Sequence, residues 1–252
     1  MKLTENTIFI TGGGTGIGRG LAEALHKLGN KVIISGRRKE HLDATTKANP
    51  GMDSVELDIS DPAYIAVVTT KLIADYPALN VLINNAGIML IDDASGKIDD
   101  QLLTSTVTTN LLGPIRLTSA LIEHLKKQPN ATVIYNTSAL AFVPLALTAV
   151  YSSTKAALHS YVLSQRYKLK ATSVSVLEIS PPWVQTDLLN SKEEPRAMPL
   201  KDFIEETMKL LASDAKEIVV QQAQPFRKNP GPNESALVTQ FNDSMIAGSS
   251  DK

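Results

Sequence analysis

Tyr151 and Lys155 are the two side chains whose types and spacing most directly suggest chemistry. A spacing of four residues places both on one face of a helix. A free phenol has a pKa of about 10 and is a poor base at neutral pH. A neighbouring ammonium favours the phenolate, which would let Tyr151 exchange a proton with a carbonyl or alcohol oxygen. Ser138, upstream of this pair, offers a hydroxyl that could hydrogen-bond the same oxygen.

A glycine-rich segment runs from Thr11 to Gly18, between an apolar stretch and a helical pattern. Glycines in such a turn let backbone amides approach a phosphate at the N-terminus of the following helix. The segment therefore predicts a dinucleotide-binding turn, although glycine-rich turns also occur without a ligand.

The residues after the second apolar stretch, Ser35-Gly36-Arg37-Arg38, indicate which dinucleotide binds. An NAD site usually carries an acid here for the ribose hydroxyls, but this chain has none until Glu40. A guanidinium matches the 2′-phosphate of NADP(H) in shape and charge, so Arg37 and Arg38 favour that cofactor. NAD(H) stays open, because Ser35 and Gly36 could serve its ribose and the two arginines could be solvated surface residues.

The elements that must position these residues follow an alternating pattern of short apolar strands and longer helices. This pattern predicts an α/β fold, a doubly wound parallel sheet of about seven strands with helices on both faces: a Rossmann fold in a single domain over residues 1–252. Its ligand site would lie beyond the carboxyl ends of the strands. The expected strands are Thr7–Ile10, Lys31–Ser35, Ser54–Leu57, Val81–Ile83, Thr132–Tyr135, Val174–Leu177 and Glu217–Val220. The expected helices are Gly16–Leu28, one opening at Pro62 with Asp61 as its N-cap, Leu102–Lys127, Val150–Leu169 and Leu200–Ala212.

The composition argues against several other classes of protein. With 25 basic and 26 acidic residues the net charge is −1, which disfavours nucleic acid or an anionic membrane as a partner. The chain has no cysteine, and its four histidines match no metal-ligand spacing, so we expect no metal site. No segment is apolar enough to span a bilayer and the first residues show no leader pattern, so we expect a cytoplasmic protein.

Further residues follow in order along the chain: Asp58 after the third expected strand, Asn84-Asn85-Ala86-Gly87 after the fourth, then Asn110 and, after Tyr151 and Lys155, Thr186. Together with the residues above, they resemble the compact, single-domain branch of the short-chain dehydrogenase/reductase family, from about Thr4 to Thr186. The chain is also somewhat similar to the bacterial DltE-like subgroup. The resemblance implies an oxidoreductase that moves hydride between a nicotinamide cofactor and a CH–OH or C=O group. It rests on the Thr11–Gly18 turn, Asp58, Asn84-Asn85-Ala86-Gly87, Asn110, Ser138, Tyr151, Lys155 and Thr186.

The resemblance also implies roles for individual residues. Asn110, Ser138, Tyr151 and Lys155 would form a catalytic tetrad, with Tyr151 as general acid/base and Asn110 holding a water beside Lys155. The residues expected at the cofactor are Gly12, Thr15, Gly16, Ile17, Gly18, Arg37, Arg38, Asp58, Ile59, Asn85, Ala86, Gly87, Tyr151, Lys155, Pro181, Val184 and Thr186. One departure is Pro181-Pro182, where the family usually has Pro-Gly, and the second proline would stiffen that loop.

Substrate contacts are expected from apolar segments around Tyr151. An apolar pocket suggests an aryl or alkyl ketone, although each of these residues could equally belong to the core or to a subunit interface. The segments are Met89–Ile91, Leu140 with Phe142–Leu145, and Trp183 with Leu188 and Leu189; the four residues chosen as the pocket are Leu140, Leu145, Trp183 and Leu188. Residues 187–200 are expected to form a mobile lid, and the tail 227–252 to pack poorly.

Three functions are compatible with these features. An NADP-dependent carbonyl reductase is favoured, a non-catalytic dinucleotide-binding redox sensor is the alternative, and a sugar epimerase or dehydratase is disfavoured by the short chain after Thr186. The helices that carry Asn110 and Tyr151 have more apolar residues than one buried stripe needs, so we expect a homodimer or homotetramer.

Overall fold

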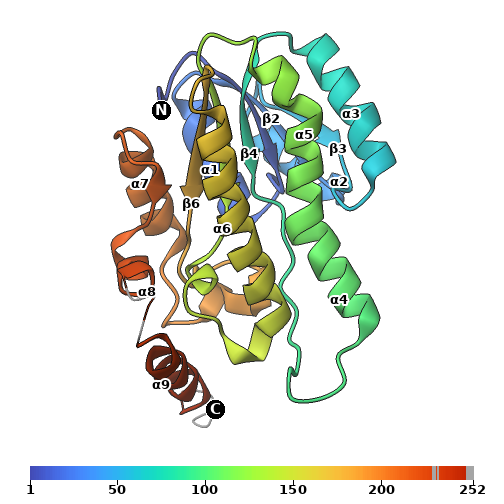
Figure 1. Ribbon diagram of the computed structural model, residues 1–252. Helices are drawn as coiled ribbons and strands as arrows, with labels where there is room; N and C mark the ends of the chain where they lie inside the picture. Colours follow the sequence, from blue (N-terminus) through green and yellow to red (C-terminus); the bar gives the residue numbers. More distant parts are fainter. Residues whose placement is uncertain (229–230, 232, 248–252) are drawn as a thin grey trace.

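Seven parallel strands form one sheet at the centre of the molecule, in the order β3-β2-β1-β4-β5-β6-β7 (Figure 1). The computed structural model describes residues 1–228, 231 and 233–247. The chain winds outward from β1 in both directions, which confirms the predicted Rossmann fold. The strands are β1 (Thr7–Thr11), β2 (Lys31–Gly36), β3 (Asp53–Glu56), β4 (Leu79–Asn84), β5 (Ala131–Asn136), β6 (Val174–Ile179) and β7 (Glu217–Ile218).

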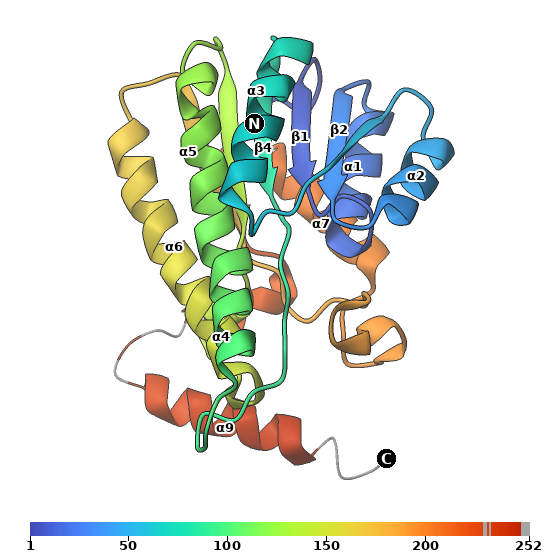
Figure 2. The same ribbon diagram turned by 90° about the vertical axis from the view of Figure 1, so that its right-hand side faces the viewer.

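Helices cover both faces of the sheet, as the two ribbon views show (Figures 1 and 2). Helices α1, α2 and α7 pack on one face, and α3, α5 and α6 on the other. In the described part of the chain, none of the helices is both long enough and apolar enough to cross a membrane. The helices are α1 (Gly16–Lys27), α2 (Lys39–Ala48), α3 (Pro62–Asp75), α4 (Asp100–Val107), α5 (Gly113–Leu125), α6 (Ala149–Leu169), α7 (Leu200–Leu211), α8 (Gln224–Lys228) and α9 (Glu234–Ala247).

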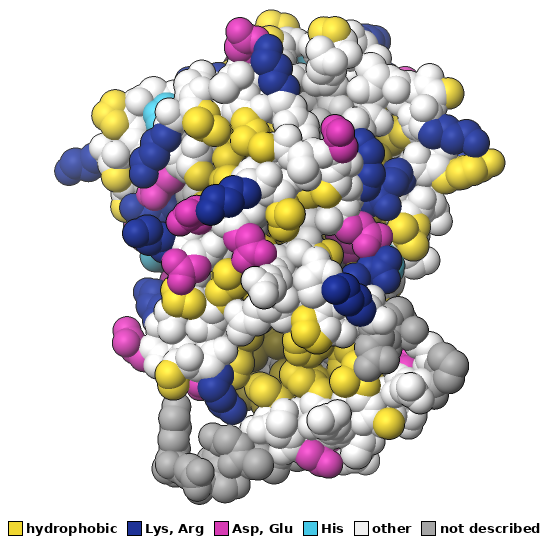
Figure 3. Space-filling model, turned by 90° about the vertical axis from the view of Figure 1, so that its left-hand side faces the viewer, with side chains coloured by type: hydrophobic (Ala, Val, Ile, Leu, Met, Phe, Trp, Pro, Cys, Tyr) yellow, Lys and Arg dark blue, Asp and Glu magenta, His cyan; other side chains and the backbone are white. Residues whose placement is uncertain are grey.

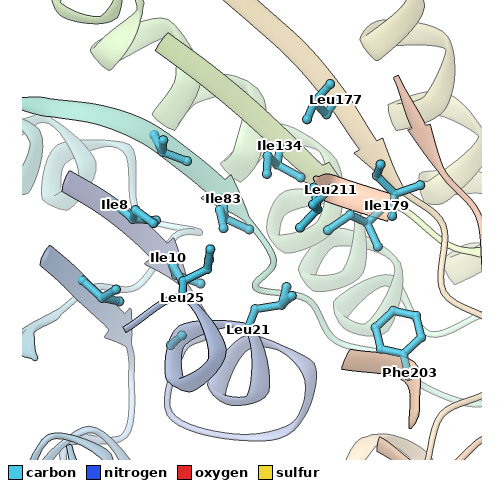
Figure 4. Close-up of a cluster of buried hydrophobic side chains, with 14 of the residues drawn as sticks. Ile8, Ile10, Leu21, Leu25, Ile83, Ile134, Leu177, Ile179, Phe203 and Leu211 are labelled. Atoms are coloured by element: carbon cyan, nitrogen blue, oxygen red, sulfur yellow. The ribbon is translucent and has the colours of Figure 1, made fainter. Parts of the chain in front are cut away.

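Two hydrophobic cores lie on opposite faces of the sheet because side chains alternate along each strand. On β1, Ile8 and Ile10 enter the core under α1 and α7, whereas Phe9 enters the core under α3, α5 and α6. Figure 4 shows the first core, with Leu21 and Phe203 facing the strand residues. Burial of both faces explains why the strands read as continuous apolar runs.

Most element boundaries match the sequence prediction, and the exceptions have local causes. Asp61 caps α3 as expected, accepting hydrogen bonds from two backbone amides of its first turn. The expected helix Leu102–Lys127 is divided by a π-helical turn, Thr108–Leu112, between α4 and α5. Helix α2 was not predicted, because it is largely polar and buries only Leu42 and Thr45.

Two helices follow β7, α8 at the start of the C-terminal tail and α9 within it, where the sequence predicted no element. Figures 1 and 2 place α9 away from the main body of the sheet, beyond the ends of α4 and α6. Asn242 attaches α9 to the body, because its side chain accepts from the Ala146 amide and donates to the Pro144 carbonyl at 3.1 Å. Positions 229–230, 232 and 248–252 of the expected tail lie outside the described residues.

Candidate active site

A cavity of about 880 Å³ opens at the carboxyl ends of the strands, where a doubly wound sheet places its ligand. Residues from the glycine turn, from the ends of β2, β4, β5 and β6, and from the start of α6 line it. All seventeen residues predicted to bind a cofactor lie on its wall, as do the four predicted for the substrate. The structure therefore brings nearly all of the predicted site together in one cavity.

The glycine turn between β1 and α1 is tight and is tied to the end of β4. Gly12 has a φ of +66°, a backbone conformation that is strained for residues with a side chain. A methyl group at Gly18 would lie 2.2 Å from the Gly12 carbonyl oxygen. The Asn85 side chain donates to the Thr11 carbonyl at 2.9 Å and so fixes the turn. Thr15 makes no side-chain capping bond, so the first amides of α1 remain available for a phosphate.

Two exposed arginines follow β2 at the far end of the cavity. Arg37 and Arg38 form no salt bridge with any residue in the described portion of the chain. Ser35 and Gly36 line the same end, and Asp58 follows β3 there. Asp58 already accepts two hydrogen bonds from Ser60, at 2.9 Å and 2.7 Å. Phosphate-binding amides at one end and arginines at the other fit a dinucleotide.

The predicted proton-transfer pair lies at the opposite end of the cavity. Tyr151 and Lys155 are buried, and the Lys155 Nζ lies 5.4 Å from the centre of the Tyr151 ring. Burial raises the pKa of Tyr151 to about 12, and a hydrogen bond with Ser138 acts in the opposite direction. Burial also lowers the pKa of Lys155 to about 8, against the negative charge of Glu178. Burial therefore shifts the pKa of each group, and a neighbouring side chain opposes each shift.

Asn110 lies next to this pair but does not line the cavity. It occupies the π-helical turn between α4 and α5, and its side chain is bound to the backbone of Ile88 at 2.9 Å and 2.7 Å. A methyl group at Gly87 would lie 3.3 Å from the Asn110 Oδ1 and 3.8 Å from the Lys155 Nζ. The glycine thus separates the two side chains with little space to spare.

The substrate end of the cavity is apolar, as Figure 3 shows for the hollow in the lower part of the molecule. Leu140, Leu145, Trp183 and Leu188 line it as predicted, and Met89, Ile91 and Leu189 join them. Leu90 and the stretch from Phe142 to Pro144 do not. Sequence reasoning missed a further wall made by Phe226 of α8 and by Phe241, Asn242 and Met245 of α9. The spacing of these three α9 residues places them on one helix face, and this spacing is the sequence signal that could have predicted the wall.

The segment predicted as a lid is folded against the cavity. Trp183 donates to the Ser191 Oγ at 2.7 Å, and Val184 pairs with Met198 as an isolated parallel bridge. Leu189 has a φ of +52°, in the left-handed region that costs about 1–3 kcal/mol for such a residue. Its movement remains a prediction.

Known proteins share this sequence and architecture. Residues 6–197 match the family model described as short chain dehydrogenase. The chain is 36% identical to an uncharacterized oxidoreductase, DltE, of Bacillus subtilis over 248 residues, covering 96% of this chain and 98% of the relative. An uncharacterized oxidoreductase of Staphylococcus aureus is 30% identical to this chain, over 73% of this chain and 80% of the relative.

This chain belongs to the short-chain dehydrogenase family. Among solved structures, a short chain dehydrogenase from Burkholderia cenocepacia in complex with NADP superposes with a TM-score of 0.84 at 25% identity, covering 95% of this chain and 98% of that one. The family assignment makes the protein a nicotinamide-dinucleotide-dependent oxidoreductase.

Two further features of the site of this short-chain dehydrogenase concern the loop after β6 and metal binding. Pro181-Pro182 follows β6, and the Pro181 carbonyl accepts from the Ala139 amide at 2.8 Å, so the stiff loop is tied to the residue after Ser138. No group of three or more histidine, aspartate or glutamate side chains in the described segments is arranged to hold a metal ion.

Proposed function

We propose that the protein is an NADP(H)-dependent carbonyl reductase acting on an apolar, aryl or alkyl ketone, with Tyr151 as the general acid. The observation that supports this most is the convergence of Tyr151, Lys155 and Ser138 where the cofactor groove meets an apolar pocket. The same residues would catalyse alcohol oxidation in the reverse direction.

The residues of the chain have separate tasks in this proposal. The bound dinucleotide would supply the hydride. Ser138 and the Tyr151 phenol hold the carbonyl oxygen, and Tyr151 gives it a proton as the alcohol forms. The Lys155 ammonium stabilises the phenolate that Tyr151 becomes, which opposes the effect of burial on its pKa. Asn110, whose side chain is hydrogen-bonded to the backbone of Ile88, would hold a water beside Lys155.

Charge at the adenine end supports a preference for NADP(H). Arg37 and Arg38 are exposed at the cavity, and no carboxylate lies among residues 35–38. A carboxylate there would repel a 2′-phosphate, whereas two guanidinium groups attract it. The Burkholderia cenocepacia relative was solved with NADP, which agrees with this preference.

The lining of the substrate end supports an uncharged, apolar substrate. The Phe226 and Phe241 rings meet edge to face at 5.2 Å, which joins α8 to α9 along the cavity wall. The charged residues at this end are already paired: Arg196 with Glu194 at 2.8 Å, and Asp187 with Lys192 at 2.6 Å. Such a wall favours binding of apolar groups and provides few partners for a phosphate or carboxylate.

Consumption of NADPH by the purified protein tests the proposal. We expect turnover with aryl and longer alkyl ketones, and much slower turnover with aldoses and with phosphorylated or carboxylated ketones. Faster reaction with the polar set would contradict the substrate class. Tight NADPH binding without turnover of any ketone would contradict the reductase and favour the redox sensor.

A further inference from the structure

A buried carboxylate lies close to the catalytic pair. Glu178 on β6 has no exposed surface, and it does not line the cavity. The Thr137 hydroxyl donates to its Oε1 at 2.6 Å, and the His159 Nδ1 lies 2.8 Å from its Oε2. A carboxylate removed from water is costly even when it is hydrogen-bonded. The fold nevertheless keeps this buried carboxylate near Tyr151 and Lys155, whose proposed chemistry depends on their ionisation.

Two connections join Glu178 to Lys155. On α6, Lys155 and His159 are four residues apart and share a helix face, and His159 binds Glu178. On β5, the Asn136 carbonyl accepts from the Lys155 Nζ at 2.8 Å, and the next residue, Thr137, donates to Glu178. The Lys155 ammonium and the Glu178 carboxylate are thus both hydrogen-bonded to the two-residue segment Asn136–Thr137.

We propose that Glu178 is a positioning residue that keeps Lys155 protonated within the buried site. Its effect on catalysis, exerted through Lys155 on Tyr151, rests on the proposed reductase function. An ammonium in a site with little water tends to lose its proton, and a fixed negative charge nearby offsets that tendency. In agreement, burial lowers the pKa of Lys155 while the Glu178 carboxylate raises it.

The other charged groups around this cluster have partners of their own. Arg227 of α8 pairs with Glu217 of β7 at 2.8 Å, and its guanidinium lies 5.0 Å from the centre of the Phe142 ring. The Phe142 ring also meets His159 edge to face, with 5.0 Å between the ring centres, and the charge of Glu178 raises the pKa of Arg227. Arg166 of α6 donates to backbone carbonyls of the sheet edge. Glu178 is therefore the carboxylate best placed to act on the ammonium.

Direct titration of Lys155 tests the proposal without cofactor or substrate. In protein carrying carbon-13 at the lysine Cε, the resonance missing from Lys155→Met identifies Lys155. We expect Glu178→Gln to lower the pKa of Lys155 by roughly one unit, since the amide keeps the acceptor for Thr137 but removes the charge. Glu178→Asp, which keeps the charge, should retain most of the effect. An unchanged pKa of Lys155 in folded Glu178→Gln would overturn the proposal.

His159→Gln is the matched control, because it removes the imidazole that binds Glu178 but keeps the Glu178 carboxylate. We expect its Lys155 titration to stay near that of the unaltered protein; a shift as large as that of Glu178→Gln would mean that packing, and not charge, is responsible. Glu178→Leu removes the same charge without a buried amide, and it replaces Glu178→Gln if that variant does not fold.

A kinetic readout follows from the same charge. The form active in reduction carries both a Tyr151 phenol and a Lys155 ammonium. Without the Glu178 carboxylate the first of these protons leaves at lower pH, whichever group loses it. The alkaline fall in kcat/KM should therefore move to lower pH in Glu178→Gln and stay in place in His159→Gln. A lowered pKa of Lys155 in a protein that reduces no ketone would uphold the role of Glu178 and reject the reductase.

Discussion

At the level of single residues, the site is built from groups whose ionisation depends on their neighbours. Burial moves the pKa of Tyr151 up and that of Lys155 down, while a hydrogen bond with Ser138 and the charge of Glu178 oppose these two shifts. The Tyr151–Lys155 pair could be predicted from spacing alone, because four residues make one helical turn. Glu178 could not, because its contact with His159 joins β6 to α6 and leaves no periodic signal in the sequence.

At the same scale, we predict that Arg37 and Arg38 make the protein prefer NADP(H) to NAD(H). Replacing both with alanine should raise the KM for NADPH on the order of tenfold or more and change that for NADH little, because charge-assisted bonds to the 2′-phosphate are lost. Steady-state kinetics with both cofactors measure this. Lys39→Ala is the matched control, since Lys39 is an exposed neighbouring cation that pairs with Asp43 and does not line the cavity. Equal effects on NADPH and NADH would refute the assignment.

At the level of elements, the strands and the helices between them determine where the site forms. The Thr11–Gly18 turn and the start of α6 were predicted correctly because strong apolar strands precede both. The α8–α9 wall was missed because the tail is rich in residues that usually mark loops, and because the apolar residues of α9 form no strong stripe on one face. The side chains of α8 and α9 that form this wall contact mainly the cavity, so the hydrophobic pattern of these helices in the sequence is weak.

Helix α9 should therefore determine which ketones are accepted. Phe241→Ala removes an aromatic ring from the cavity wall, and we expect kcat/KM for a bulky apolar ketone to fall roughly tenfold. A small ketone that does not reach the wall should be affected little. Gln240→Ala, on the exposed side of α9, should leave both rates unchanged. Identical losses for large and small ketones in Phe241→Ala would show that α9 does not contact the substrate.

At the level of the whole molecule, one doubly wound sheet places the residues predicted to bind cofactor and those predicted to bind substrate in a single cavity. The near-zero net charge and the absence of cysteine are consistent with a small-molecule enzyme, and a cytoplasmic location remains a prediction. Large hydrophobic side chains stay exposed on two of the helices predicted to form an interface: Leu103 of α4 and Leu163 and Tyr167 of α6. Leu163 and Tyr167 lie one helical turn apart on α6 and mark a candidate contact surface there.

We predict a homodimer or homotetramer formed through that surface. Sedimentation at micromolar concentration should give a mass of two or four chains, and Leu163→Glu with Tyr167→Glu should reduce it. Tyr64→Glu on α3 is the control, because Tyr64 is an exposed aromatic residue elsewhere on the molecule. A monomer at micromolar concentration would contradict the prediction.

The most direct test of the proposed reductase compares the unaltered protein with Tyr151→Phe for NADPH-dependent reduction of an apolar aryl ketone. The substitution removes one hydroxyl from a buried ring, so the fold and the cofactor groove should survive. We predict that turnover falls by a factor on the order of a thousand or more while NADPH affinity, measured by fluorescence titration, changes little. Turnover in Tyr151→Phe equal to that of the unaltered protein would contradict the assignment of Tyr151 as the proton donor.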